Sequence, residues 1–124
     1  MKSANNFKMQ RYYIYMLRCD DNSIYTGFTT DVERRFKEHI EKKKPYGKYT
    51  RSHIPKRIEA VWSCNEKNKA CSLEYHIKRL TKNQKEQLIA CSDKLSELLE
   101  AKLNCSDFCP VNPNSFIKEC ESNG

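Results

Sequence analysis

The chain has 124 residues and a formal net charge of +7 at pH 7. This length predicts one domain with a modest core and argues against several domains. Because no stretch approaches the ~20 apolar residues of a membrane span and the first residues lack an apolar segment, we expect neither a membrane protein nor a secreted one. The positive charge favours an acidic partner, nucleic acid before an anionic membrane, although it can also serve solubility alone.

The seven cysteines bear on the compartment and on metal binding. An odd number of cysteines without a secretory signal predicts reduced thiols and a cytoplasmic location. Near the C-terminus, Cys105 and Cys109 are four positions apart and Cys120 is distant, with no His nearby. That spacing is poor for zinc, so we expect no zinc site there.

A polar lead-in, residues 1–10, precedes a predicted strand–turn–strand unit. Residues 12–19 are aromatic and apolar and lack Gly and Pro, which favours a strand. Residues 20–23 are Asp-Asp-Asn-Ser, all turn formers, and residues 24–28 form a second short strand candidate. Alternation along the first strand places Tyr13, Tyr15 and Leu17 on one face.

A helix is predicted to follow, from about residue 30 to residue 42. The sequence Thr-Asp-Val-Glu at residues 30–33 has the pattern of a capping box with Thr30 as the N-cap. Val32 and Phe36 begin an apolar stripe along the helix. Arg35 and His39 are four residues apart beside that stripe, so we expect them to converge with the strand tyrosines in a cleft.

The next segment, residues 41–56, is predicted to be a basic loop. Pro45, Gly47 and Pro55 break regular structure, and Glu41 is its only acidic residue. Lysines neutralise phosphates and aromatic rings stack on splayed bases, so we expect contact with nucleic acid. A solvated loop that only keeps the protein soluble is the alternative. The candidate nucleic-acid-binding residues are Lys42, Lys43, Lys44, Lys48, Tyr49 and Arg51.

A third strand is predicted over residues 57–63, with Ile58, Ala60 and Trp62 on one face. A helix over residues 68–80 follows, with an apolar stripe at helical spacing. Glu74 lies at the margin of that stripe. It is either a functional carboxylate or a surface residue paired with Lys78 four positions on.

The remaining chain predicts two helices and a tail. Thr-Lys-Asn-Gln at residues 81–84 is another capping-box pattern, which predicts a helix to about residue 91. A C-terminal helix over residues 92–103 has four leucines on one face. Residues 104–124 are rich in Asn, Ser and Pro and predict an irregular tail. A protein partner bound through this C-terminal region is one alternative function.

Several polar residues of these elements form a set with a defined order and spacing. They are Tyr13-Ile14-Tyr15, Tyr25-Thr26-Gly27, Arg35, His39 and Glu74. The set resembles the motifs of the GIY-YIG nuclease superfamily, and the resemblance covers about residues 11–91. Tyr13 stands where the first motif has Gly, and Thr26 where the second has Ile. Both departures look like the small single-domain bacterial branch and the catalytic domain of structure-specific endonucleases.

The resemblance implies an α/β (α+β) domain with a small three-stranded, mixed or antiparallel sheet flanked by helices. It also implies five catalytic residues: Tyr15, Tyr25, Arg35, His39 and Glu74. Glu74 would bind one Mg²⁺ or Mn²⁺ ion, a hard cation for which one carboxylate plus waters suffices. The fork of Arg35 fits phosphate oxygens. Either tyrosine could activate a water molecule, with His39 accepting the proton onward, and the sequence does not choose between the tyrosines.

These residues predict a divalent-metal-dependent endonuclease that hydrolyses DNA. A domain of this size has little surface for reading bases, so we expect recognition of shape or structure, as in DNA repair or recombination. Some members of the family have a Lys where this chain has Phe28, and Lys48 or Arg51 could supply that charge. A non-catalytic nucleic-acid-binding module and an RNA-directed nuclease are the alternatives.

Overall fold

The computed structural model describes residues 10–46 and 54–116, and the side chains of residues 10–41 and 54–116. The predicted order of strands and helices is present, with a further short strand near the end. The elements are β1 (Tyr12–Cys19), β2 (Ile24–Thr29), α2 (Val32–Tyr46), β3 (Pro55–Cys64), α3 (Lys67–Lys78), α4 (Lys82–Ala90), α5 (Lys94–Leu99) and β4 (Cys109–Val111), with 3-10 turns at Cys105–Asp107 and Pro113–Phe116.

The strands form one antiparallel sheet in the order β2-β1-β3-β4. The predicted α+β class is therefore confirmed, but the sheet has four described strands where three were expected. β4 is only three residues long and contains Pro110, opposite Trp62 of β3. Such a segment carries no strand signal of its own, and a proline is tolerated there because β4 is at the edge.

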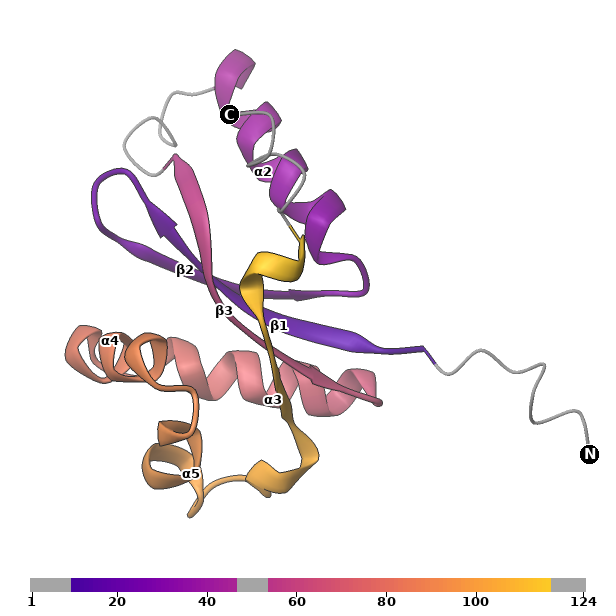
Figure 1. The fold of residues 1–124 in the computed structure, drawn as a ribbon, viewed down its shortest axis with the longest axis vertical. Coiled ribbons are helices and arrows are strands. Elements are labelled where there is room, and N and C mark those ends of the chain that lie inside the picture. The colour runs from indigo at the N-terminus through magenta and orange to yellow at the C-terminus, as the bar shows by residue number, and fades with distance from the viewer. Residues whose placement is uncertain (1–9, 47–53, 117–124) are drawn as a thin grey trace, which may run out of the picture.

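The two faces of the sheet are covered by different helices (Figure 1). One face, with Ile14 and Trp62, packs against α3, α4 and α5 in the larger apolar cluster. The other face, with Tyr15 and Leu17, packs against Val32 of α2 in a smaller cluster. The predicted common face of alternate β1 residues is thus observed, and β1 carries buried side chains on both sides because helices cover both.

The strand β3 contains a bulge that reverses one prediction. Met16 of β1 pairs with Ala60, but the next residue, Leu17, pairs with Ile58, so Glu59 is an extra residue in β3. An extra residue shifts the alternation of side chains by one position. Ala60 therefore joins the larger cluster and Ile58 the smaller one, and the prediction that they share a face is wrong.

Helix α2 differs from its prediction at both ends. The Asp31 carboxylate accepts a hydrogen bond from the backbone N–H of Arg34 at 3.2 Å, so Asp31, one residue after the predicted Thr30, provides the side-chain cap. At the other end the helix continues to Tyr46. Residues 42–46 are therefore helical, which corrects the prediction of a loop from residue 41. Residues 47–53 lie outside the described residues.

The capping box predicted at Thr81 is confirmed. The Thr81 hydroxyl accepts from the backbone N–H of Gln84 at 3.1 Å, and the Gln84 side chain accepts from the backbone N–H of Thr81 at 3.0 Å. This reciprocal pair starts α4 directly after α3 ends at Lys78.

The C-terminal segment is more ordered than predicted. The helix expected over residues 92–103 is the shorter α5, and residues 105–116 pack on the domain where an irregular tail was expected. Cys105 and Phe108 are buried in the larger cluster, whereas Val111 and Phe116 pack against the smaller one. The Phe116 ring meets the edge of Tyr13 with centroids 6.0 Å apart. A few well-placed apolar side chains anchor this segment despite its polar composition.

The described cysteines are free thiols, and Cys120 lies outside the described residues. Cys19, Cys64 and Cys105 are buried; the other described ones are exposed. Among the described helices, none has the length and apolar character needed to cross a membrane.

Candidate active site

The candidate site begins at a close approach between two neighbouring strands. Tyr15 of β1 is paired with Gly27 of β2, and its ring lies over the glycine. A Cβ atom on Gly27 would be 2.6 Å from the Tyr15 hydroxyl oxygen and 2.8 Å from Cζ. No side chain fits there unless the Tyr15 ring moves, so the space above Gly27 fixes where the hydroxyl lies.

The Tyr15 hydroxyl points at His39 of α2. Its oxygen is 3.1 Å from Nε2 of His39, with the direction of donation set by the imidazole tautomer. Tyr25 completes the arrangement: its ring centroid is 4.8 Å from that of His39 and 6.2 Å from that of Tyr15. Tyr15 is 2% exposed and Tyr25 is 39% exposed, so only Tyr25 presents substantial surface to solvent.

The electrostatic environment distinguishes the two tyrosines further. Burial raises the pKa of Tyr15 well above its ordinary value, and the neighbouring Tyr25 adds to this shift. The Arg35 guanidinium beside the Tyr15 hydroxyl acts in the opposite direction and lowers the pKa. Burial dominates, so Tyr15 remains a neutral phenol at physiological pH.

Four of the five predicted catalytic residues therefore converge, from β1, β2 and α2. We call them the tyrosine cluster: Tyr15, Tyr25, Arg35 and His39. The fifth, Glu74, lies on α3. This helix packs against β2 and β1 on the opposite side of the sheet from α2 (Figure 1). Its side chain is 22% exposed and pairs with Lys78 at 3.3 Å, the contact expected of an ordinary surface carboxylate.

Glu38 is a residue that the sequence analysis did not single out. One of its carboxylate oxygens accepts from Arg35 at 3.0 Å and the other from Arg34 at 2.8 Å. The hydrogen bond from Arg35 is the main cause of a lowered pKa of Glu38 and, reciprocally, of a raised pKa of Arg35. The i,i+3 and i,i+4 spacing from the two arginines is the signal that could have found it.

The predicted nucleic-acid-binding residues are only partly described. Lys42, Lys43 and Lys44 belong to the last turns of α2, but their side chains are outside the described part of the chain. Lys48, Tyr49 and Arg51 lie wholly outside it. The six residues thus remain a prediction.

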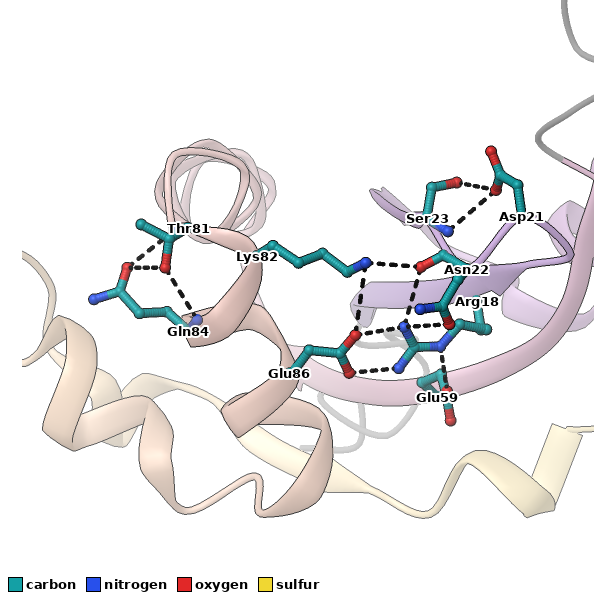
Figure 2. Close-up of polar contacts among 9 residues, drawn as sticks. All are labelled: Arg18, Asp21, Asn22, Ser23, Glu59, Thr81, Lys82, Gln84 and Glu86. Carbon is teal, nitrogen blue, oxygen red and sulfur yellow. Dashed lines mark hydrogen bonds and ion pairs between the residues drawn. The ribbon is translucent and has the colours of Figure 1, made fainter.

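A second polar cluster lies on the other face of the sheet and was not predicted. Arg18 of β1 is buried, and it donates to Glu59 of β3 at 2.8 Å and to both carboxylate oxygens of Glu86 of α4, at 2.6 and 2.7 Å (Figure 2). Lys82 donates to the backbone carbonyl of Asn22 at 3.0 Å, and Asn22 has a positive φ of 73° in the β1–β2 turn. This Arg18 cluster joins the turn, β3 and α4.

The sheet, its two helix layers and the tyrosine cluster define a small α+β domain with phenol, imidazole and guanidinium groups gathered beside an edge strand. The sequence pattern of the GIY-YIG catalytic domain matches residues 11–87. The chain belongs to the GIY-YIG family, whose domains are in general nuclease domains that act on nucleic acids and use divalent metal ions.

Individual relatives show which members of the family the chain resembles. It is 45% identical over 89 residues to the UPF0213 protein FN1575 of Fusobacterium nucleatum, an alignment covering 72% of this chain and 87% of that one. It is 46% identical over 79 residues to the UPF0213 protein BH0048 of Halalkalibacterium halodurans, covering 64% and 82%. The solution NMR structure of BH0048 covers 64% of this chain and 83% of its own at 45% identity, with a TM-score of 0.42. The predicted resemblance to small single-domain GIY-YIG proteins is confirmed.

Proposed function

We propose that this protein is a divalent-metal-dependent endonuclease that hydrolyses phosphodiester bonds in DNA. The observation that carries the proposal is the convergence of Tyr15 and Tyr25 on His39, with Arg35 beside the Tyr15 hydroxyl. Hydrolysis at phosphorus needs a deprotonated water and positive charge near the phosphoryl oxygens, and this cluster holds candidates for both tasks.

The two tyrosines take different roles in this proposal. Tyr25 is the more exposed phenol and lies edge-to-face against His39, so it is the candidate general base, which in its phenolate form would receive the proton of the attacking water. Tyr15 stays neutral because burial raises its pKa, so it orients His39 through the bond to Nε2. Proton transfer from the resulting Tyr25 phenol to the neutral imidazole of His39 would restore the phenolate and leave the proton on His39.

Arg35 is the candidate phosphate ligand. Its guanidinium is permanently charged, and its planar fork can donate two parallel hydrogen bonds to phosphate oxygens. Its guanidinium lies beside the Tyr15 hydroxyl and near Tyr25, so a phosphate held by Arg35 would lie next to both tyrosines. Arg35 would thus hold the phosphate close to the candidate general base, Tyr25.

The donor chemistry of Glu74 fits one hard divalent ion. Its carboxylate is partly exposed, and Mg²⁺ often takes only one or two protein carboxylates while keeping waters and substrate phosphate oxygens. Within the described ranges there is no group of three or more His, Cys, Asp or Glu side chains that could hold a metal. A one-carboxylate site is therefore the arrangement to test. The ion would neutralise charge on the phosphoryl and leaving oxygens.

The proposed substrate is DNA recognised by shape or structure, in repair or recombination. The domain is small and its net charge is positive, which suits contacts with the phosphate backbone more than with base edges. A non-catalytic nucleic-acid-binding module is a second candidate, favoured by the ion pair in which Lys78 already satisfies Glu74.

The test is cleavage of plasmid, flap, branched-junction, single-stranded DNA and RNA substrates with Mg²⁺, Mn²⁺ or EDTA. Glu74→Gln is compared with Glu97→Gln, which removes an equal charge from another helix-surface ion pair, with Lys94. We expect metal-dependent cutting that falls about a hundredfold or more in Glu74→Gln only, as for loss of a key electrostatic group. Binding without cutting in the wild type, with equal binding by both variants, supports the binding module. Preferential cutting of RNA makes the protein an RNA-directed nuclease.

A further inference from the structure

Glu38 occupies an unusual position between two arginines of α2. In a helix, successive residues are rotated by about 100°, so Glu38 projects from an angle between those of Arg34 and Arg35, one turn later. Each carboxylate oxygen takes one guanidinium, at 2.8 Å and 3.0 Å. The two guanidinium groups therefore converge on one carboxylate, although the two arginine side chains leave the helix in different directions.

The geometry points to a phosphate-binding site made by both arginines, in which the Glu38 carboxylate holds the place of a phosphodiester until nucleic acid displaces it. A phosphodiester also presents two charged oxygens, and guanidinium groups bind phosphates as they bind carboxylates. This inference rests on the proposed nucleic-acid substrate, and it adds Arg34 and Glu38 to the single phosphate ligand, Arg35.

The exposure of the three side chains makes the exchange feasible. Arg35 and Glu38 are each 34% exposed and Arg34 is 55% exposed, so nucleic acid can reach them and Glu38 can turn into solvent. Exposed ion pairs contribute little stability, so breaking them costs little. Without Glu38, Arg35 should keep a second interaction, because its guanidinium also interacts with the Tyr15 hydroxyl.

The charges around Arg34 set how strong the site can be. Asp31 lies 3.7 Å from Arg34, and the shallow depression beside it is lined by further carboxylates, Glu33 and Glu41, as well as Lys37. These acids repel a phosphate that approaches Arg34 from that side. The site should therefore favour a phosphate that approaches from the side of Arg35. Glu38 competes with the phosphate for both arginines, so weak, non-specific anions do not displace it.

The helix provides a matched control for each residue. Glu33 pairs with Lys37 at 3.6 Å on the same helix, four residues apart like the Arg34–Glu38 pair. Glu38→Gln and Glu33→Gln remove the same charge, and so do Arg34→Gln and Lys37→Gln. Any effect of net charge, of repulsion between nearby carboxylates and the phosphate, or of helix stability should appear in both members of each pair, so only the difference within a pair reports the shared site.

The experiment measures binding of a fluorescent single-stranded or branched DNA by anisotropy, in EDTA, over a range of salt concentrations. We expect Glu38→Gln to bind about two- to fivefold more tightly than Glu33→Gln, the range that an exposed ion pair allows. We expect Arg34→Gln to bind more weakly than Lys37→Gln and to lower the slope of log affinity against log salt by about one.

If each variant binds like its control, the shared site is wrong and the Arg34–Glu38–Arg35 contacts are ordinary surface ion pairs. Because the assay needs no cleavage, it separates the two claims. Differences between the matched pairs in a protein that never cuts DNA support the phosphate site without the nuclease. Cleavage by a protein whose matched pairs agree supports the nuclease without the shared site. No DNA binding by the wild type overturns both.

Discussion

Strand β1 carries two polar side chains, three residues apart, whose surroundings differ in kind. Arg18 lies on the face covered by α3, α4 and α5, and two carboxylates and a turn carbonyl surround its guanidinium. Tyr15 lies on the face covered by α2, where its hydroxyl lies beside His39 and Arg35. Arg35 in turn donates to the partly exposed carboxylate of Glu38. The Arg18 guanidinium is thus surrounded by its hydrogen-bond partners, whereas the tyrosine cluster is exposed to solvent at Tyr25.

The difference predicts a structural role for the Arg18 cluster and a chemical role for the tyrosine cluster. A buried charge is tolerated only when it is fully paired, and pairs from β3 and α4 satisfy Arg18 and raise its pKa. A reactive site instead needs groups whose hydrogen-bonding capacity is left for substrate. We therefore expect changes in the Arg18 cluster to alter stability, and changes in the tyrosine cluster to alter activity.

The largest effect is expected for Tyr25→Phe. Removing the hydroxyl of the proposed general base should lower single-turnover cleavage about a hundredfold or more. The thermal unfolding temperature should stay near that of the wild type, because the ring remains and the residue is 39% exposed. Tyr75→Phe, at the other exposed tyrosine among the described side chains, is the control and should cleave normally. Full activity in Tyr25→Phe would remove Tyr25 from the proposed mechanism.

Arg18→Met should show the opposite pattern. It leaves Glu59 and Glu86 without their main partner, which should lower the free energy of unfolding by about 2–4 kcal/mol in urea titrations. Activity per folded molecule should change little. Replacing Arg18, Glu59 and Glu86 together with apolar residues should recover much of the loss. A stable Arg18→Met protein with poor cleavage would show that the Arg18 cluster serves the site.

Gly27→Ala tests the contact on which the tyrosine cluster depends. The added Cβ would meet the Tyr15 ring, so the ring must shift and its hydroxyl must leave His39. Overpacking of this kind should cost about 1–3 kcal/mol of stability, and cleavage should fall as well. The His39 imidazole signals followed by NMR would report the lost hydrogen bond. Unchanged His39 signals together with normal cleavage would contradict the role given to Gly27.

The smallest effect concerns Glu86 and pH. Arg18 holds the pKa of Glu86 below its usual range, so the folded protein takes up this proton less readily than the unfolded chain. The resulting stability is present above the unfolded pKa of about 4.3 and is lost as pH falls through the lower folded value. Glu86 is 37% exposed, so we expect at most about 1 kcal/mol.

The corresponding measurement is urea unfolding of the wild type and Glu86→Gln from pH 7 to pH 3. The wild type should be the more stable of the two at pH 7, and the difference should shrink below about pH 4.3. Glu97→Gln, which breaks a surface pair with Lys94, should show a smaller difference at every pH. A constant difference for Glu86→Gln across this range would mean that the ion pair with Arg18 contributes no stability.

Local pattern accounts for the parts of the fold and site that could be predicted. Alternation in residues 12–19 placed Tyr15 on the face with Tyr13 and Leu17, and helical spacing placed Arg35 beside His39. Both follow from backbone geometry over a few residues. The capping box at Thr81 was predictable for the same reason, because all its hydrogen bonds lie within four residues.

Features that depend on contacts between residues far apart in the sequence were not predicted. The side chain of Arg18 is buried by Glu59 and Glu86, which are 41 and 68 residues away. The bulge at Glu59 depends on the register between β1 and β3, and β4 exists only because β3 offers an unpaired edge. Neither register nor edge pairing leaves a periodic mark in one strand's own sequence.

By itself, the sequence determined the order of the elements, the α+β class, the family and the set of polar residues gathered around His39, because short-range periodicity and motif spacing encode them. The tertiary structure alone decided that Tyr15 is buried and neutral while Tyr25 is exposed to solvent. It also placed Glu74 on α3, on the opposite side of the sheet from α2. The structure also decided that the guanidinium of Arg18 is buried and paired with Glu59 and Glu86. Burial and pairing are properties of the packed domain, since each depends on which distant side chains displace water from the group.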